Sequence, residues 1–289
     1  MTGTSSNATV SSSRANPSGS LMTDIAFARA ISFAIGMLVF SLLMSGSHRA
    51  GAAALDDTVE RYRPYLIERI DQALAGARDL QSKIAAHDLA GAKRAWLAAR
   101  AGWECSEVFT TGFVPELDSQ IDAWPDATTG FHAIEAKLFG DGTTDAAGEA
   151  DALVKHLSDL HDRLRSMPLT LQGLMEGTVR LAYEVGESKS DGGESRISGT
   201  SLQDMRNNVA GIAFAHRTLF AGSLNAADGE LAGAINGKLD ELNALVSAPD
   251  LQRVDIPKLR RVTEELVVEL QDAATKLGLQ KPALEQAQQ

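Results

Sequence analysis

Residues 89–109 read LAGAKRAWLAARAGWECSEVF, and this stretch decides what kind of fold the chain can adopt. Alanine, a strong helix former, dominates it. Trp96 and Trp103 stand seven residues apart, so a helix places both indole rings on one face. Glu104 and Glu107 stand three residues apart and also share a face. The pattern predicts a helix that is packed through its tryptophans and carries paired carboxylates close to the packed side.

Helical patterns recur along the rest of the chain, and no segment has a convincing strand pattern. Apolar residues at spacings of three and four predict further helices over residues 56–85, 128–138, 151–165, 169–187, 202–219, 230–246 and 257–277. Residues 113–126 are expected to form a loop with short helical turns, and Ser201 is expected to cap the helix that follows it. The predicted fold class is therefore all-α, a helical bundle, and two packed four-helix bundles are one form that it could take.

Composition and charge argue against some classes of function. The 289 residues carry a net charge of −11, and aromatic residues make up only 5% of the chain. No basic patch interleaves with aromatic residues, so nucleic acid is not expected as a partner. The single cysteine, Cys105, excludes an internal disulfide and is expected to be a small buried helix residue.

The N-terminal part of the chain has the pattern of an export signal. A Ser/Asn/Thr-rich start precedes the apolar run Ala30–Met44, and residues 51–54 (GAAA) offer a cleavage site near Ala54. Residues 1–54 are therefore expected to be a disordered N-terminus with an export signal, and residues 55–289 an exported, periplasmic helical domain. An uncleaved membrane anchor is the alternative.

A histidine and a glutamate stand three residues apart in TTGFHAIEAKLF, residues 128–139. At helical pitch, His132 and Glu135 lie on one face. Gly130 allows the backbone to turn tightly into this helix. An imidazole and a carboxylate aimed at one point make half of a metal site, but a helix-surface ion pair would explain the pair equally well.

Metal-binding helical bundles hold the ion with side chains that project inward from facing helices. Three groups of side chains could do so here: Glu104 with Glu107, Asp122 in the sequence ELDSQIDAW, and His132 with Glu135. Four carboxylates and one neutral imidazole suit Fe, Mn or Zn better than Cu(I). For each group alone, a solvated charged face is the alternative.

These segments, in this order, resemble the imelysin-like family, and within it the EfeO/EfeM proteins of bacterial iron uptake. AKRAWLAARAGWECSE resembles the family's helix with two glutamates, and ELDSQIDAW its Leu-Asp-x-x-Ile-Asp-Ala-Arg segment. TGFHAIEAKLF resembles its strongest signature, Gly-Phe-His-x-Ile-Glu. YEVGESKSDGGESRISGTSLQDMRNNVAG resembles its later block, which ends in Asn-x-x-Gly.

The resemblance implies an exported helical bundle that binds a metal ion through five residues: Glu104, Glu107, Asp122, His132 and Glu135. Iron is the ion it favours, with zinc, manganese and copper as alternatives, and an inner-membrane iron permease is the implied partner. The chain resembles the short form of the family, with the helical domain only.

The chain also departs from the family pattern. Trp124 stands where the family has arginine, and residues 198–202 read SGTSL where the family has Ser-His-Thr-Asp-Leu. Ser195 replaces an acid of the family's Gly-Glu-Glu, while Glu184 and Glu194 stay candidates for further ligands.

Two other functions stay open from the sequence. One is a metal-dependent enzyme of the bacterial envelope, either an imelysin-type peptidase or a di-iron oxidase, although the chain lacks the Glu-x-x-His motif that a di-iron site would usually show. The other is a metal-free adhesion or scaffold module, for which the acids and the histidine would have to lie apart in space.

Overall fold

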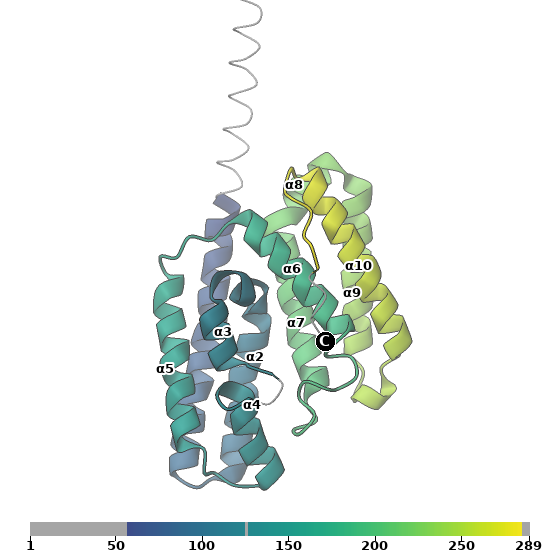
Figure 1. The fold of residues 1–289 in the computed structure, drawn as a ribbon. Coiled ribbons are helices and arrows are strands. Elements are labelled where there is room, and N and C mark those ends of the chain that lie inside the picture. Colours follow the sequence, from purple (N-terminus) through teal and green to yellow (C-terminus); the bar gives the residue numbers. More distant parts are fainter. Residues whose placement is uncertain (1–56, 125–126, 285–289) are drawn as a thin grey trace, which may run out of the picture. The chain divides into compact units, whose positions relative to one another are not determined.

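The structure is a computed structural model that describes residues 57–124 and 127–284 (Figure 1). The expected export signal and its cleavage position lie outside the described residues. A helix over residues 57–85 comes first, and the later elements are α2 (Leu89–Phe113), α3 (Pro115–Ile121), α4 (Gly130–Glu135), η1 (Ala136–Asp141), α5 (Ala147–Leu164), α6 (Leu171–Gly186), α7 (Ser201–Ala215), η2 (His216–Phe220), α8 (Ala221–Ala227), α9 (Gly229–Val246), η3 (Leu251–Arg253) and α10 (Ile256–Lys276). These residues contain no strand, so the all-α prediction is confirmed.

The helices form two groups that meet along α2. In the second group, α6, α7, α9 and α10 make a four-helix bundle in which each helix packs against two neighbours (Figure 1). In the first group, the helix over residues 57–85, α2 and α5 are long, and the short α3 and α4 pack against α5. Helix α2 also contacts α6 and α7, so it belongs to the interface between the groups.

Close helix contacts explain why small residues are needed on this interface. A Cβ atom at Gly211 of α7 would lie 2.5 Å from the carbonyl oxygen of Cys105 in α2, so only glycine allows this approach. On the other side of α2, Trp96 and Trp103 are fully buried. Helix α2 is therefore packed on both sides, and its polar side chains are enclosed by neighbouring elements.

Three details differ from the sequence predictions. The helix predicted over residues 202–219 is α7, which ends at Ala215, followed by the π-helical turn η2. The helix predicted over residues 128–138 is the short α4 followed by the π-helical turn η1, in which the backbone is wound more widely. The predicted cap at Ser201 is wrong. Ser201 is the first residue of α7, and its hydroxyl oxygen instead accepts a hydrogen bond from the Ser195 amide at 3.2 Å.

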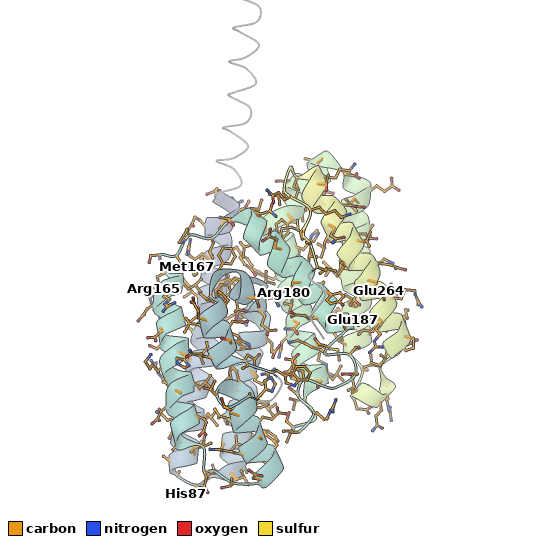
Figure 2. The ribbon with its side chains drawn as sticks, viewed as in Figure 1. His87, Arg165, Met167, Arg180, Glu187 and Glu264 are labelled. Atoms are coloured by element: carbon orange, nitrogen blue, oxygen red, sulfur yellow. The ribbon has the colours of Figure 1, made fainter. Side chains whose placement is uncertain are left out.

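Polar contacts also link the two groups. Arg180 on α6 donates a hydrogen bond to the Glu107 carbonyl oxygen of α2 at 3.0 Å (Figure 2).

Within residues 57–124 and 127–284, no helix has both the length and the apolar character that crossing a membrane requires.

Candidate metal centre

The end of α3 and the start of α4 bring an aspartate and a histidine together. Gly130 begins α4 with a φ of +71°, and a Cβ atom there would lie 2.2 Å from the Ile121 carbonyl oxygen. This contact folds the chain back so that His132 lies beside Asp122, the residue that ends α3. The indole nitrogen of Trp103 donates a hydrogen bond to Asp122 Oδ2 at 2.6 Å and so fixes the carboxylate.

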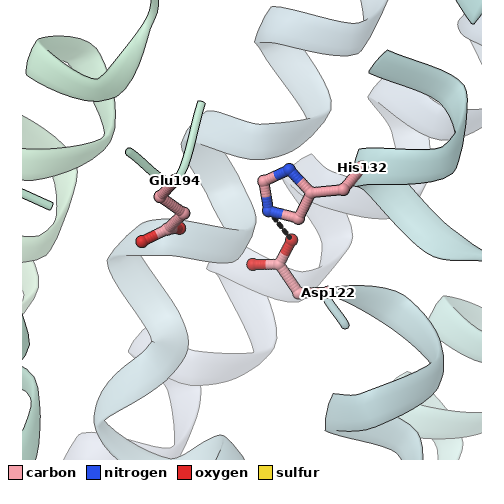
Figure 3. A group of neighbouring side chains, drawn as sticks. All are labelled: Asp122, His132 and Glu194. Carbon is pink, nitrogen blue, oxygen red and sulfur yellow. Dashed lines mark ion pairs between the residues drawn. The ribbon is translucent and has the colours of Figure 1, made fainter. Parts of the chain in front are cut away.

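The His132 ring is buried and has one nitrogen without a satisfied partner. Its Nδ1 atom lies 2.9 Å from Glu135 Oε2, and Glu135 Oε1 accepts hydrogen bonds from the Ser198 amide and hydroxyl at 2.8 and 2.6 Å. Its Nε2 atom lies 3.3 Å from Asp122 Oδ1, but it makes no well-directed hydrogen bond to any described residue. Glu194 lies across from this nitrogen, and the three side chains surround one point (Figure 3).

The two glutamates of α2 lie beside this point. Asn208 of α7 donates to Glu104 Oε2 at 2.9 Å and to Glu107 Oε2 at 2.7 Å. The Lys189 ammonium contacts the same two oxygens, at 2.9 and 3.1 Å, and Glu194 Oε1 at 3.0 Å. Residues 187–200, which carry Lys189 and Glu194, form turns rather than a helix.

Arg100 is the second cation of the site and comes from α2 itself. Its guanidinium pairs with Asp122 at 2.7 Å and with Glu194 at 3.2 Å, and it also contacts Glu104 one turn along the helix. Asp204 of α7 accepts from the same group at 3.3 Å. The side chain is 1% exposed, so it neutralises these carboxylates from within the protein.

Negative charge exceeds fixed positive charge in this cluster. The cluster holds one arginine and one lysine, Arg100 and Lys189, and six carboxylates: Glu104, Glu107, Asp122, Glu135, Glu194 and Asp204. Burial, together with the neighbouring Glu104 carboxylate, raises the pKa of Glu107 well above its usual range. Burial also raises the pKa of Glu194 to about 7. The metal-free cluster therefore retains protons that a bound cation would replace.

The histidine and the aspartate shift each other's ionisation. Burial alone would lower the pKa of His132, but the negative charge of the nearby Asp122 carboxylate and the hydrogen bond with Glu135 outweigh it and raise this pKa to about 9. Burial would raise the pKa of Asp122, but Arg100 and His132 hold it well below its usual range. A metal ion that binds at Nε2 must therefore displace a proton from His132 near neutral pH.

The five residues proposed from the sequence are all in this cluster. The structure brings ligand atoms within 4.8 Å of one another in three overlapping sets: Asp122 with His132 and Glu194, Glu104 with Glu107 and Asp122, and Glu104 with Glu194 and Asp204. Glu135 belongs to none of these sets, because its carboxylate is turned to the His132 ring and to Ser198. Of the two further candidates, Glu194 lies in the cluster, whereas Glu184 pairs with Arg180 on α6.

Sequence reasoning missed four polar residues of the cluster: Arg100, Lys189, Asp204 and Asn208. Arg100 could have been found, since it stands four residues before Glu104 and an arginine at that spacing pairs with a glutamate. Asp204 and Asn208 are also four apart and share one face of α7. Lys189 lies in a segment without periodicity, and no local pattern indicates where its side chain goes.

Comparisons with known proteins agree with this architecture. The family model described as Imelysin matches residues 58–128 and 126–277. The chain is 30% identical over 205 residues to an EfeM/EfeO family lipoprotein of Staphylococcus haemolyticus, covering 67% of this chain and 71% of that protein. It is 32% identical over 170 residues to the iron uptake system component EfeO of Yersinia pseudotuberculosis, covering 55% of this chain and 45% of that protein.

A solved structure supports the fold. The chain is similar to the crystal structure of an iron-regulated protein A precursor from Parabacteroides distasonis, with a TM-score of 0.51 and 18% identity over 77% of this chain and 95% of that one. At this identity the likeness concerns the fold alone. The family match and the identity to relatives go further, and they show that the chain belongs to the imelysin family and is an EfeO/EfeM-type protein.

Proposed function

We propose that this protein is a periplasmic component of an iron-uptake system. In this proposal it binds the iron ion as cargo in the carboxylate–histidine cluster and passes it to a membrane permease. The names of its relatives, an EfeM/EfeO family lipoprotein and an iron uptake system component, support the uptake role and export from the cytoplasm.

One observation carries the binding step. His132 Nε2 is buried and lies 3.3 Å from Asp122 Oδ1 without a well-directed hydrogen bond, and its ligand atom lies within 4.8 Å of those of Asp122 and Glu194. An unsatisfied buried polar atom costs free energy, so it calls for a partner. A proton on Nε2 meets this need while His132 is charged, and a metal cation that faces the same two carboxylates would take the place of the proton.

The donor set suits the proposed cargo. Imidazole nitrogen and carboxylate oxygen are ligands for Fe, Mn and Zn, whereas Cu(I) prefers sulfur. In this proposal Asp122, His132 and Glu194 hold the ion first, and Glu104 and Glu107 complete its surroundings. Glu135 then fixes the ring through Nδ1, which is the usual arrangement for a histidine ligand.

The hydroxyl groups near the histidine are not arranged for a serine nucleophile. Ser198 contacts Glu135 and not the free Nε2 atom, so the order of contacts is serine, glutamate, histidine. A nucleophilic serine would need its hydroxyl at the histidine nitrogen that takes up its proton. No described hydroxyl or thiol hydrogen-bonds to that nitrogen.

Metal titration of the protein with a matched pair of histidine variants tests the proposal. We expect near-stoichiometric iron after anaerobic loading, measured by elemental mass spectrometry. The His132→Ala variant should lose affinity on the order of 100-fold or more, because even residues that only support a ligand contribute 10–100-fold.

The control is His87→Asn. His87 lies at the exposed turn before α2 (Figure 2), where its φ of 53° suits asparagine. Its affinity should match the wild type, and both variants should keep the helical circular dichroism of the parent. Equal affinity in His132→Ala and the wild type would refute the assignment of the site.

A further inference from the structure

Lys189 holds the position that a cation would take among the carboxylates. Its Nζ atom lies 2.9 Å from Glu104, 3.1 Å from Glu107 and 3.0 Å from Glu194. Three carboxylate oxygens around one ammonium group resemble the surroundings of a bound metal ion. The side chain is only 3% exposed, so its charge is not shared with solvent.

The same carboxylates belong to the sets that could hold a metal. Glu104 and Glu107 form one set with Asp122, and Glu194 forms another with Asp122 and His132. A metal ion binds carboxylate oxygen at about 2.0–2.6 Å, so an ion in either set would lie within a few ångströms of an ammonium that stays in place. At such a separation, two like charges in a buried site repel each other strongly.

Arg100 cannot leave the cluster as easily as Lys189. Its guanidinium lies over the rings of Trp96 and Phe131, at 5.3 and 5.4 Å from their centroids. It also forms ion pairs with carboxylates on α2, on α7 and at the end of α3. A planar group held on several sides is a fixed counter-charge.

Lys189 is placed differently. It is carried by the non-helical segment 187–200, and its ammonium sits at the end of a flexible four-carbon stem. Two of its partners, Glu107 and Glu194, are each 11% exposed, so the cage reaches the protein surface on that side. Exchange of the ammonium would therefore require movement of the Lys189 side chain and its non-helical segment, and not of a helix.

We propose that Lys189 is an exchangeable counter-cation, which occupies the carboxylate cage in the metal-free protein, leaves it when the metal ion binds, and returns when the ion is released. This inference rests on the proposed metal-binding function. It gives the protein a way to release a tightly held ion, because the carboxylates that lose the metal regain an ammonium partner instead of staying buried and unpaired.

Amine labelling with and without metal tests the exchange directly. The protein is treated briefly with acetic anhydride, metal-free or saturated with Zn²⁺ or Fe²⁺ under anaerobic conditions, and acetylation of each lysine is read by mass spectrometry. Lys189 should be protected without metal and labelled at least several-fold faster with it. Lys155, which is 68% exposed, should label equally in both states and serves as the internal reference.

A charge-removing variant provides a second measurement. Lys189→Met keeps the length of the stem and removes the ammonium, so it should bind Zn²⁺ at least roughly tenfold more tightly and release it more slowly. Lys155→Met removes the same charge from an exposed ion pair and should bind like the wild type. Weaker or unchanged binding in Lys189→Met would overturn the inference.

The labelling experiment stays decisive if Lys189→Met fails to fold. Metal content is measured on the labelled samples, so the two proposals are separable. Bound metal with Lys189 still protected overturns the exchange and leaves the metal site standing. No bound metal in the wild type overturns the proposed function and the exchange with it.

Discussion

Two buried histidines in this protein have opposite surroundings. His132 lies in α4, just before the π-helical turn η1, and its ring sits between Asp122 and Glu135. His216 is the first residue of the π-helical turn η2 and is fully buried, and neither of its ring nitrogens has a hydrogen-bond partner among the described residues. The pKa of His132 is raised to about 9, whereas burial lowers that of His216 to about 4.

The difference shows that burial does not by itself make a binding site. Burial favours the neutral imidazole at both positions. At His132, carboxylates within about 3 Å reverse this effect. Asp122 stays charged in the interior because Arg100 pairs with it, and Glu135 does so because His132 and Ser198 hydrogen-bond to it. The buried cation beside Asp122 is therefore part of what separates the two histidines.

Of the variants that test this difference between the two histidines, Arg100→Met should have the largest effect on stability. In Arg100→Met, the carboxylates of Glu104, Asp122 and Asp204 lose their shared buried partner. We expect the free energy of unfolding of the metal-free protein to fall by roughly 3–5 kcal/mol, the usual cost of breaking a buried ion pair. Urea unfolding followed by circular dichroism measures the loss.

The matched control for this variant is Arg61→Met. Arg61 pairs with Asp57 on the first helix, and its side chain is 60% exposed, so its removal should change stability by no more than about 0.5 kcal/mol. If Arg100→Met lost as little as the control, the cluster would not depend on a buried cation, and the account of the two histidines would be wrong.

The dependence on buried cations also explains how much the sequence could predict. The helix around Trp96 and Trp103 was predictable because its spacing is local. The shared face of His132 and Glu135 was predictable for the same reason. Lys189 was not, because two of its partners, Glu104 and Glu107, are more than 80 residues away along the chain and its own segment has no periodicity.

The spacing of residues along the chain also could not predict the direction in which a side chain points. A separation of three residues fixes the face that Glu135 shares with His132, but not whether its oxygens point to an ion or to the ring. The contact of Glu135 with Ser198, which turns its carboxylate away from the other acids, depends on the segment that follows α6, far along the chain. The π-helical turn η1 was missed because the spacing of Ile134 and Leu138 also fits an ordinary helix.

The unpaired histidine, His216, should make the folded protein less stable in acid. The pKa of His216 lies near 4 in the folded protein and near 6.5 when unfolded, so between these values the unfolded chain binds a proton that the folded protein excludes. Stability from this group is complete above pH 6.5 and is lost as the pH falls through 4. The loss is about 3 kcal/mol in total.

The variant His216→Leu removes this pH-dependent contribution to the free energy of unfolding. Denaturant unfolding at pH 7, 5.5 and 4.5 should show a shallower decline for the variant than for the wild type, whatever its stability at pH 7. His87→Asn, an exposed histidine variant, should decline in parallel with the wild type. Parallel lines for His216→Leu would mean that water or a nearby group solvates the ring, and the contrast with His132 would then be smaller than the structure implies.

The smallest expected effect tests how firmly His132 is held. Ser198 donates to Glu135 Oε1 through both its amide and its hydroxyl, and Ser198→Ala removes only the hydroxyl contact. The backbone amide continues to hold the carboxylate, so the loss should be near 1 kcal/mol, or roughly fivefold in Zn²⁺ affinity by calorimetry. Ser247→Ala, at the exposed end of α9, should have no effect on affinity. A loss as large as that of His132→Ala would instead place Ser198 among the groups that hold the ion, whereas no loss would mean that the amide alone orients Glu135 and, through it, the histidine.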